Sequence, residues 1–325
     1  MHIFDLHEDI STYFLNGYEV KDFGLNDPNR PVDLPKYKKA NVKYVVGAVF
    51  SGKRFLKPKN GMFGTSFRDA FTETWDQIAF YHRLTNRYSN ELHLISSGRD
   101  LRELLKTNKI GLIIGIEGAY PLDNPWDLEL YYKLGVRVLG LTWNVDNKYA
   151  ASCKTAKDYG LTGLGEKLVD LASELGVIID LAHASKRTSL DVLSITEKPV
   201  IISHAGVKAV YNTDRNVDDE VLEALRSNKG VMGIFLYTGA LSGNEVNIDT
   251  VVKHILYVYE NFGVDILALG TDYLGIQTAP KGLESIDKIT HLVNKLKNAG
   301  LTSKDLEKVF YRNALRVFSK CLRNQ

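Results

Sequence analysis

Three carboxylates and one histidine lie within five positions of one another in the opening segment MHIFDLHEDI. If this segment forms an extended strand, residues two apart face the same side, so His7 and Asp9 can hold one metal ion. Asp5 shares that face one step deeper, where it either supports the ligands or is an ordinary buried polar residue. The segment therefore predicts a metal site, and the simplest alternative is a solvated arm.

Four further apolar runs end in an ionisable residue, namely Glu117, His183, His204 and Asp272. One such residue alone is more often structural, but its recurrence at five run ends favours a shared site. Histidine and carboxylate ligands without cysteine are typical of zinc or another borderline divalent ion. Six side chains are too many for one catalytic zinc, and they suit two ions about 3.5–4 Å apart with Glu117 between them.

A triad of serine, histidine and aspartate is the alternative catalytic arrangement. The chain contains no GxSxG segment. Ser203 and His204 are adjacent, so on a strand their side chains should face opposite sides. The sequence therefore favours metal chemistry over a serine nucleophile.

These residues need a frame that brings the run ends together. Eight short apolar runs alternate with polar, amphipathic segments, which predicts parallel strands buried on both faces. The runs are residues 2–4, the segment VKYVVGAVF, and residues 112–118, 136–142, 177–183, 199–206, 231–236 and 266–272. Residues 91–96 are a ninth candidate, expected outside the repeat. Eight units predict an α/β fold of the eightfold parallel β/α (TIM) barrel type, whose active site lies at the carboxyl ends of the strands.

Helices are predicted between most of these runs. The clearest segments are residues 74–84, 165–176, 218–230, 249–263 and 302–320. Gly176, Gly230 and Gly263 are expected to end three of them, and the last segment is expected to pack on the outside. No GxGxxG follows the first run, which disfavours a dinucleotide fold. No linker-like stretch divides the chain, so residues 1–325 are predicted to form a single catalytic barrel domain.

Composition excludes several classes of protein. The net charge of +2 gives no sign of a nucleic-acid or anionic-membrane surface, and the basic stretch 53–59 is predicted to be a solvated loop. No apolar run reaches about 18 residues, so no membrane span is expected. The two cysteines and the absence of a signal-peptide pattern favour a cytoplasmic location.

Several segments together resemble the renal (membrane) dipeptidase family of zinc peptidases, a branch of the metal-dependent amidohydrolase barrels. DLHED resembles the family's Asp-Gly-His-Asn-Asp, and GIEG its Gly-Ile-Glu-Gly. LGVRVLGLTWN, GLTGLGEKLVDLASELGVIIDLAHAS and PVIISHAGVKAVYNTDRNVDDEVL resemble the family's middle part, and GTDYLG its Gly-Ser-Asp-Phe-Asp-Gly. The resemblance runs along nearly the whole chain.

The resemblance implies two Zn²⁺ ions per chain, with another divalent metal as the alternative. One ion would be held by His7, Asp9 and Glu117, and the other by Glu117, His183 and His204. Glu117 would therefore act in catalysis as the bridging ligand.

The resemblance also implies the residues around the substrate. Asp272 would be the catalytic acid and base, and Arg215 would bind the substrate's terminal carboxylate. Trp143 stands where better-studied members have a histidine that polarises the scissile carbonyl. Tyr120 ends a segment that is Gly-Gly-His in the family, and Leu274 replaces the second aspartate of the last motif. Trp143, Tyr120 and Asp272 are thus expected to line the substrate pocket.

The expected function is zinc-dependent hydrolysis of dipeptides, including those with a D residue on the carboxyl side. A substrate anchored by both its free amine and its carboxylate must be short. The alternatives are another amidohydrolase-type enzyme acting on an amide or lactone, and a non-catalytic metal-binding barrel. The expected partner is a small dipeptide, without nucleic acid or membrane, and a homodimer is compatible with the sequence.

Overall fold

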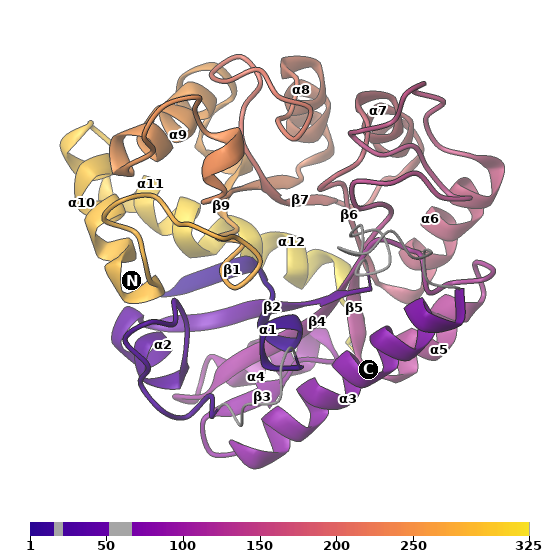
Figure 1. Ribbon diagram of the computed structural model, residues 1–325, viewed down its shortest axis with the longest axis horizontal. Helices are drawn as coiled ribbons and strands as arrows, with labels where there is room; N and C mark the ends of the chain where they lie inside the picture. Colours follow the sequence, from indigo (N-terminus) through magenta and orange to yellow (C-terminus); the bar gives the residue numbers. More distant parts are fainter. Residues whose placement is uncertain (16–21, 52–66, 325) are drawn as a thin grey trace, which may run out of the picture.

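Eight parallel strands close into a barrel in the computed structural model, with the helices arranged around them (Figure 1). The structure describes residues 1–15, 22–51 and 67–324. The barrel strands are β1 (Ile3–Glu8), β2 (Val42–Phe50), β4 (Ile110–Glu117), β5 (Val136–Gly140), β6 (Ile178–Asp180), β7 (Ile201–Ala205), β8 (Val231–Ile234) and β9 (Leu267–Leu269). Strand order follows the chain from β4 to β9, then β1 and β2, and pairing of β2 with β4 closes the ring. The predicted eightfold β/α barrel is confirmed.

The ninth predicted strand is β3 (Leu92–Leu94), and it lies outside this ring. It pairs with the first residues of β4, while β5 pairs with β4 further along. Because β2 occupies the other edge of β4 over residues 111–117, β3 and β5 share one edge. The expectation of an extra strand beside the repeat is therefore confirmed.

Helices follow most strands, as the chain pattern predicts. They are α1 (Ile10–Leu15), α2 (Leu34–Ala40), α3 (Phe67–Arg87), α4 (Gly98–Leu104), α5 (Asp127–Lys133), α6 (Gly163–Leu175), α7 (Lys186–Ile195), α8 (Asp219–Asn228), α9 (Ile248–Phe262), α10 (Ile289–Asn298), α11 (Ser303–Glu307) and α12 (Asn313–Cys321). A π-helical turn, η5 (Lys308–Arg312), joins the last two. The basic stretch 53–59 lies outside the described residues.

Two of the three glycines predicted to end helices do so. Gly176 follows α6 with a φ of 79°, and Gly263 follows α9 with a φ of 87°. At the end of α8 the left-handed residue is Lys229, with a φ of 63°, so the prediction of Gly230 is wrong by one position. Gly230 is required for another reason, because a Cβ there would lie 2.5 Å from the carbonyl oxygen of Val200.

The amino end of the barrel is filled by apolar side chains, and α12 covers it. Phe4 at the start of β1 packs on Phe318 of α12 with ring centroids 4.8 Å apart. Val231 at the start of β8 and Val317 of α12 belong to the same buried cluster. The last helix therefore covers the amino end, not the outer face that the sequence analysis expected, because its apolar stripe matches the apolar floor of the barrel. Figure 1 shows α12 within the ring of strand labels.

Among the residues that the structure describes, no helix combines the length and the apolar character that a bilayer span requires.

Candidate functional site

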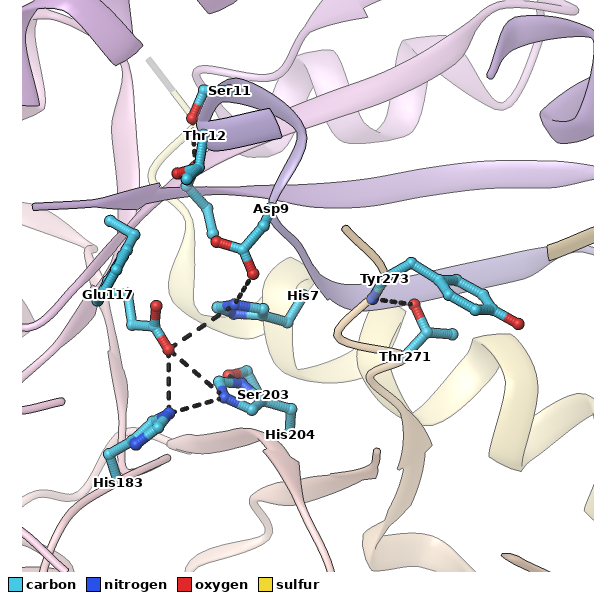
Figure 2. A network of polar contacts seen from close by, with 12 residues as sticks. His7, Asp9, Ser11, Thr12, Glu117, His183, Ser203, His204, Thr271 and Tyr273 are labelled. Atoms are coloured by element: carbon cyan, nitrogen blue, oxygen red, sulfur yellow. Dashed lines mark hydrogen bonds and ion pairs between the residues drawn. The ribbon is translucent and has the colours of Figure 1, made fainter. Parts of the chain in front are cut away.

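Three imidazoles converge on one carboxylate at the carboxyl ends of the strands (Figure 2). Glu117 is the last residue of β4, and its Oε1 lies 3.0 Å from His183 Nε2. The same oxygen lies 3.5 Å from Nε2 of His204 in β7 and 3.8 Å from Nε2 of His7 in β1. The structure thus brings together four of the six predicted residues around a single oxygen atom.

The other two predicted carboxylates complete this cluster. Asp9 Oδ2 lies 3.5 Å from His7 Nε2. One ligand atom each of His7, Asp9 and Asp272 lies within 4.8 Å of the others. Gly275 leaves the room for this approach, because a Cβ there would lie 2.1 Å from Asp9 Oδ2 and 2.6 Å from Asp272 Oδ1. Side chains from both ends of the sequence therefore share one site.

The first strand reaches the site by an irregular backbone. The register of β1 against β2 shifts between Asp5 and Glu8, so the simple alternation assumed for this strand does not hold. The carboxylate of Asp5 accepts hydrogen bonds from the backbone N (2.9 Å) and Oγ (2.6 Å) of Thr271. Asp5 is therefore a buried polar residue that fixes the segment directly before Asp272.

Hydrogen bonds at the Nδ1 atoms orient two of the imidazoles, those of His183 and His204. His183 Nδ1 lies 2.9 Å from Oδ1 of Asn144, which can only accept, so Nδ1 carries the proton and Nε2 has a free lone pair. Ser203 Oγ lies 2.8 Å from His204 Nδ1. The prediction that these two adjacent side chains face apart is wrong, and β7 has a register shift against β8 within residues 202–205. Nothing in the sequence pattern marked Asn144.

Two site residues have a left-handed backbone. His183 and Asp272 each have a φ of 63°, in a region where residues other than glycine cost about 1–3 kcal/mol. Both follow the end of a short strand, β6 and β9. Such conformations concentrate at functional sites, where the surrounding structure holds them in place.

The cluster has too little positive charge for its carboxylates. Burial raises the pKa of Glu117 to about 8, with His7 opposing and Asp9 and Asp272 adding to the rise. Burial likewise raises the pKa of Asp272 to about 7, again against His7. Burial disfavours protonation of His7, yet Glu117, Asp9 and Asp272 raise its pKa to about 10. Bound cations would relieve this repulsion between carboxylates.

The remaining two imidazoles are kept neutral. Burial lowers the pKa of His183 and of His204, and the positive charges of Arg215 and His7 lower them further. Their Nε2 atoms lie only 3.0 Å apart. His7 Nε2 is buried and makes no hydrogen bond to a described residue. Nitrogen lone pairs and carboxylates directed at one another fit a site for borderline divalent ions such as zinc.

A cavity of about 430 Å³ opens beside the cluster. Phe50 and Trp143 form part of its wall, with ring centroids 5.0 Å apart. Arg215 also lines it, is only 9% exposed, and donates from Nη2 to the carbonyl oxygen of His204 at 3.1 Å. No ion pair joins Arg215 to a carboxylate of the described chain. A buried guanidinium without a carboxylate partner is suited to an anionic ligand.

Tyr120 does not lie in this cavity wall. Its hydroxyl donates to the carbonyl oxygen of Val145 at 2.5 Å and accepts from the backbone N of Trp143 at 2.8 Å. Gly118, with a φ of 87°, turns the chain just before it. The hydroxyl of Tyr120 therefore holds the backbone of the segment that carries Trp143.

Besides Asn144 and Thr12, three polar residues of the cavity wall were not identified from the sequence. Lys154, Tyr237 and Gln277 line the cavity from loops after β5, β8 and β9. None belongs to a strand end or to a recognisable motif, so only the folded path of the loops brings them there.

Comparison with known proteins agrees with this geometry. A sequence model of the family described as membrane dipeptidase (peptidase family M19) matches residues 1–325. The chain is 34% identical over 258 residues to an uncharacterized dipeptidase of Schizosaccharomyces pombe, covering 76% of this chain and 62% of the relative. It is 31% identical over 324 residues to dipeptidase 3 of Macaca fascicularis, covering 92% and 65%. The chain thus spans less than two thirds of the length of these two relatives.

Solved structures share the fold. A metallo peptidase from Rhodobacter sphaeroides, liganded with a phosphinate mimic of the dipeptide L-Ala-D-Ala, superposes with a TM-score of 0.87. The two chains are 20% identical, and the match covers 99% of each. A dipeptidase described as a metallo peptidase of family M19 gives a TM-score of 0.85 at 20% identity over 99% of both chains. Because the family's sequence model covers the whole chain, the protein belongs to the membrane dipeptidase family, peptidase family M19.

Proposed function

We propose that the protein is a zinc-dependent dipeptidase that hydrolyses the single peptide bond of a free dipeptide. The main support is the convergence of three imidazoles on Glu117 Oε1 beside the buried, unpaired Arg215. A metal cluster and an anion-binding group in one cavity suit a small substrate that ends in a carboxylate. Membership of the membrane dipeptidase family and dipeptidase-named relatives support the same activity.

Arg215 would fix one end of the substrate. Its planar guanidinium can donate two parallel hydrogen bonds to the terminal carboxylate. The cavity of about 430 Å³ is within the range of small-molecule sites, about 300–1,000 Å³. A dipeptide therefore places its peptide bond between Arg215 and the imidazole cluster.

The metal ligands would be His7, Asp9, Glu117, His183 and His204. When bound, divalent ions supply Lewis-acid chemistry, polarising the peptide carbonyl and acidifying a water molecule. Asp272 lies next to the cluster, so its carboxylate can accept the proton of the attacking water. As the carbon–nitrogen bond breaks, Asp272 passes that proton to the leaving amine. Trp143 and Phe50 shield this wall of the cavity from water.

The proposed activity is tested with a library of free dipeptides that carry L or D residues at each end. The metal-loaded protein is expected to cleave free dipeptides and to leave N-acetylated dipeptides intact. D residues on the carboxyl side belong in the library because the ligand of the Rhodobacter sphaeroides relative mimics L-Ala-D-Ala. Cleavage of lactones or simple amides, with no turnover of dipeptides, would assign the site to another hydrolase activity.

Elemental analysis is expected to find about two zinc ions per chain, as in two-ion hydrolytic sites. The physical reason is the donor set, since six converging side chains exceed what one catalytic zinc accepts. The measurement uses protein purified without chelator, before and after dialysis against a chelator. A metal-free protein with undiminished dipeptide turnover would contradict the proposal.

Replacing Arg215 with alanine is expected to impair hydrolysis of free dipeptides far more than that of dipeptide amides. A charged hydrogen bond contributes about 1.5–3 kcal/mol, which corresponds to roughly a tenfold to hundredfold loss in kcat/KM. Arg215→Lys should recover only part, because the planar fork is lost. Arg226→Ala is the matched control, since Arg226 is an exposed residue of α8 paired with Glu223. Equal losses on both substrates would show that Arg215 is structural.

A further inference from the structure

Two cations without a carboxylate partner line the same cavity. Arg215 is buried and donates a hydrogen bond to the backbone carbonyl of His204. Lys154 is exposed, lines the cavity, and its ammonium makes no hydrogen bond or ion pair with a described residue. The wall between the loops after β5 and β7 therefore offers two positive charges to a ligand.

Two other lysines near this end of the barrel are paired. Lys208 Nζ lies 3.4 Å from Asp218 Oδ2, and Lys186 Nζ lies 2.7 Å from Glu220 Oε2. Lys154 differs from both, since its ammonium forms no ion pair with a carboxylate of the described chain.

The backbone that carries Lys154 is held on both sides. The backbone N of Ser152 donates to Asp146 Oδ1 at 2.7 Å, and the hydroxyl of Thr155 donates to Asp146 Oδ2 at 2.7 Å. The backbone N of Cys153 donates to the carbonyl oxygen of His183 at 2.7 Å. Lys154 thus extends from a segment tied directly to a residue of the imidazole cluster.

Lys154, Arg215 and His183 of the imidazole cluster all line this one cavity. The carboxylates nearest to the cavity, Glu117 and Asp272 among them, belong to the cluster itself. Lys154 and Arg215 are the two cationic side chains among the described residues that line this cavity.

We infer that Lys154 binds a second carboxylate of the substrate, so that the enzyme prefers dipeptides whose carboxyl-terminal residue is aspartate or glutamate. This inference rests on the proposed dipeptidase function. Arg215 takes the terminal carboxylate, and Lys154 takes the side-chain carboxylate of the same residue. The free amine of the substrate is a cation and is repelled from this wall. The apolar lining residues Phe50, Trp143 and Ile276 accept an uncharged side chain.

The test compares Ala-Asp with Ala-Asn and Ala-Glu with Ala-Gln, each with an L or a D second residue. The wild type is expected to favour the acidic member of each pair by about tenfold in kcat/KM, the lower range for a hydrogen bond to a charged group. Lys154→Gln should abolish this ratio, and Lys154→Arg should restore part of it. Lys157→Gln is the matched control, because Lys157 is an exposed lysine of the same loop that does not line the cavity. It should leave the ratio unchanged.

Binding provides a readout that does not depend on turnover. Calorimetry with phosphinate mimics of Ala-Asp and Ala-Asn should show the same preference in the wild type and its loss in Lys154→Gln. If the wild type cleaves Ala-Ala but shows no preference for Asp over Asn or for Glu over Gln as the second residue, the role of Lys154 is overturned and the dipeptidase proposal stays intact. A Lys154→Gln protein that loses equal activity on Ala-Ala and Ala-Asp would assign Lys154 to general substrate binding, which also overturns it. Full metal content with no dipeptide turnover and no mimic binding would overturn the proposed function itself.

Discussion

Replacing Asp272 with asparagine is expected to lower kcat by about 10²–10⁴-fold, the usual effect of losing a general base, while both metal ions stay bound. Asparagine keeps the size of the side chain but cannot take a proton. Asp272 is also the site carboxylate with a backbone φ of 63°, a conformation that asparagine tolerates well. Zinc content and turnover are to be measured on the same preparation.

The outcome separates proton transfer from metal binding. Retained zinc with lost turnover and a nearly unchanged KM would assign the proton transfer to Asp272. If the variant holds its zinc and cleaves dipeptides at nearly the wild-type rate, the proton must follow another route. Loss of zinc in parallel with activity would make Asp272 a ligand, consistent with its distance to His7 and Asp9.

Replacing His183 with asparagine is expected to remove metal first and activity with it. His183 Nε2 lies 3.0 Å from the bridging candidate Glu117 Oε1, so its loss opens one of the two proposed ion sites. Lewis-acid stabilisation contributes several kcal/mol, and about 4 kcal/mol corresponds to roughly a thousandfold loss of rate. The measurement is zinc content by elemental analysis together with dipeptide turnover.

His254 gives a control for the loss of any buried histidine. It lies in α9, where Nδ1 accepts from the backbone N of Val207 and Nε2 contacts the carbonyl oxygen of Leu241. His254→Asn should lower thermal stability but keep the full zinc content. If both variants lose zinc equally, the metal loss reports general unfolding and His183 has no special role.

The strand ends are the part of the site that sequence could predict. An apolar run followed by His183 or Glu117 has meaning because parallel barrel strands all end at one mouth. Residues far apart in the chain, such as His7 and Asp272, are therefore brought together by the fold class alone. The eight apolar runs were sufficient to predict the barrel, and the observed ring of strands agrees with that prediction.

Loops and irregular strands are the part that sequence could not predict. Lys154 and Asn144 reach the site because the segment after β5 folds back on His183. The hydrogen bonds that hold it there, from Asn144 and from the backbone N of Cys153, cannot be inferred from the hydrophobic periodicity of the sequence. Asp5 was assigned to the ligand face because a regular strand alternates, and the register shift in β1 breaks that rule. Tyr120 was expected in the pocket by analogy of position, whereas its hydroxyl is used by backbone groups below Trp143.

The pairing of the first barrel strand, β1, with the last, β9, has a consequence for how the chain folds. Asp5 of β1 accepts hydrogen bonds from Thr271, two residues after the end of β9, and the two residues are 266 positions apart in sequence. Contacts of such long range form late, because the loss of chain entropy precedes any gain from the contact. His7 and Asp9 come from β1 and the residue after it, whereas Asp272 follows β9. The complete site therefore exists only when β1 and β9 have paired and the ring is closed. A divalent ion that binds only the closed form shifts the equilibrium towards it, and metal supply should therefore raise the yield of refolding.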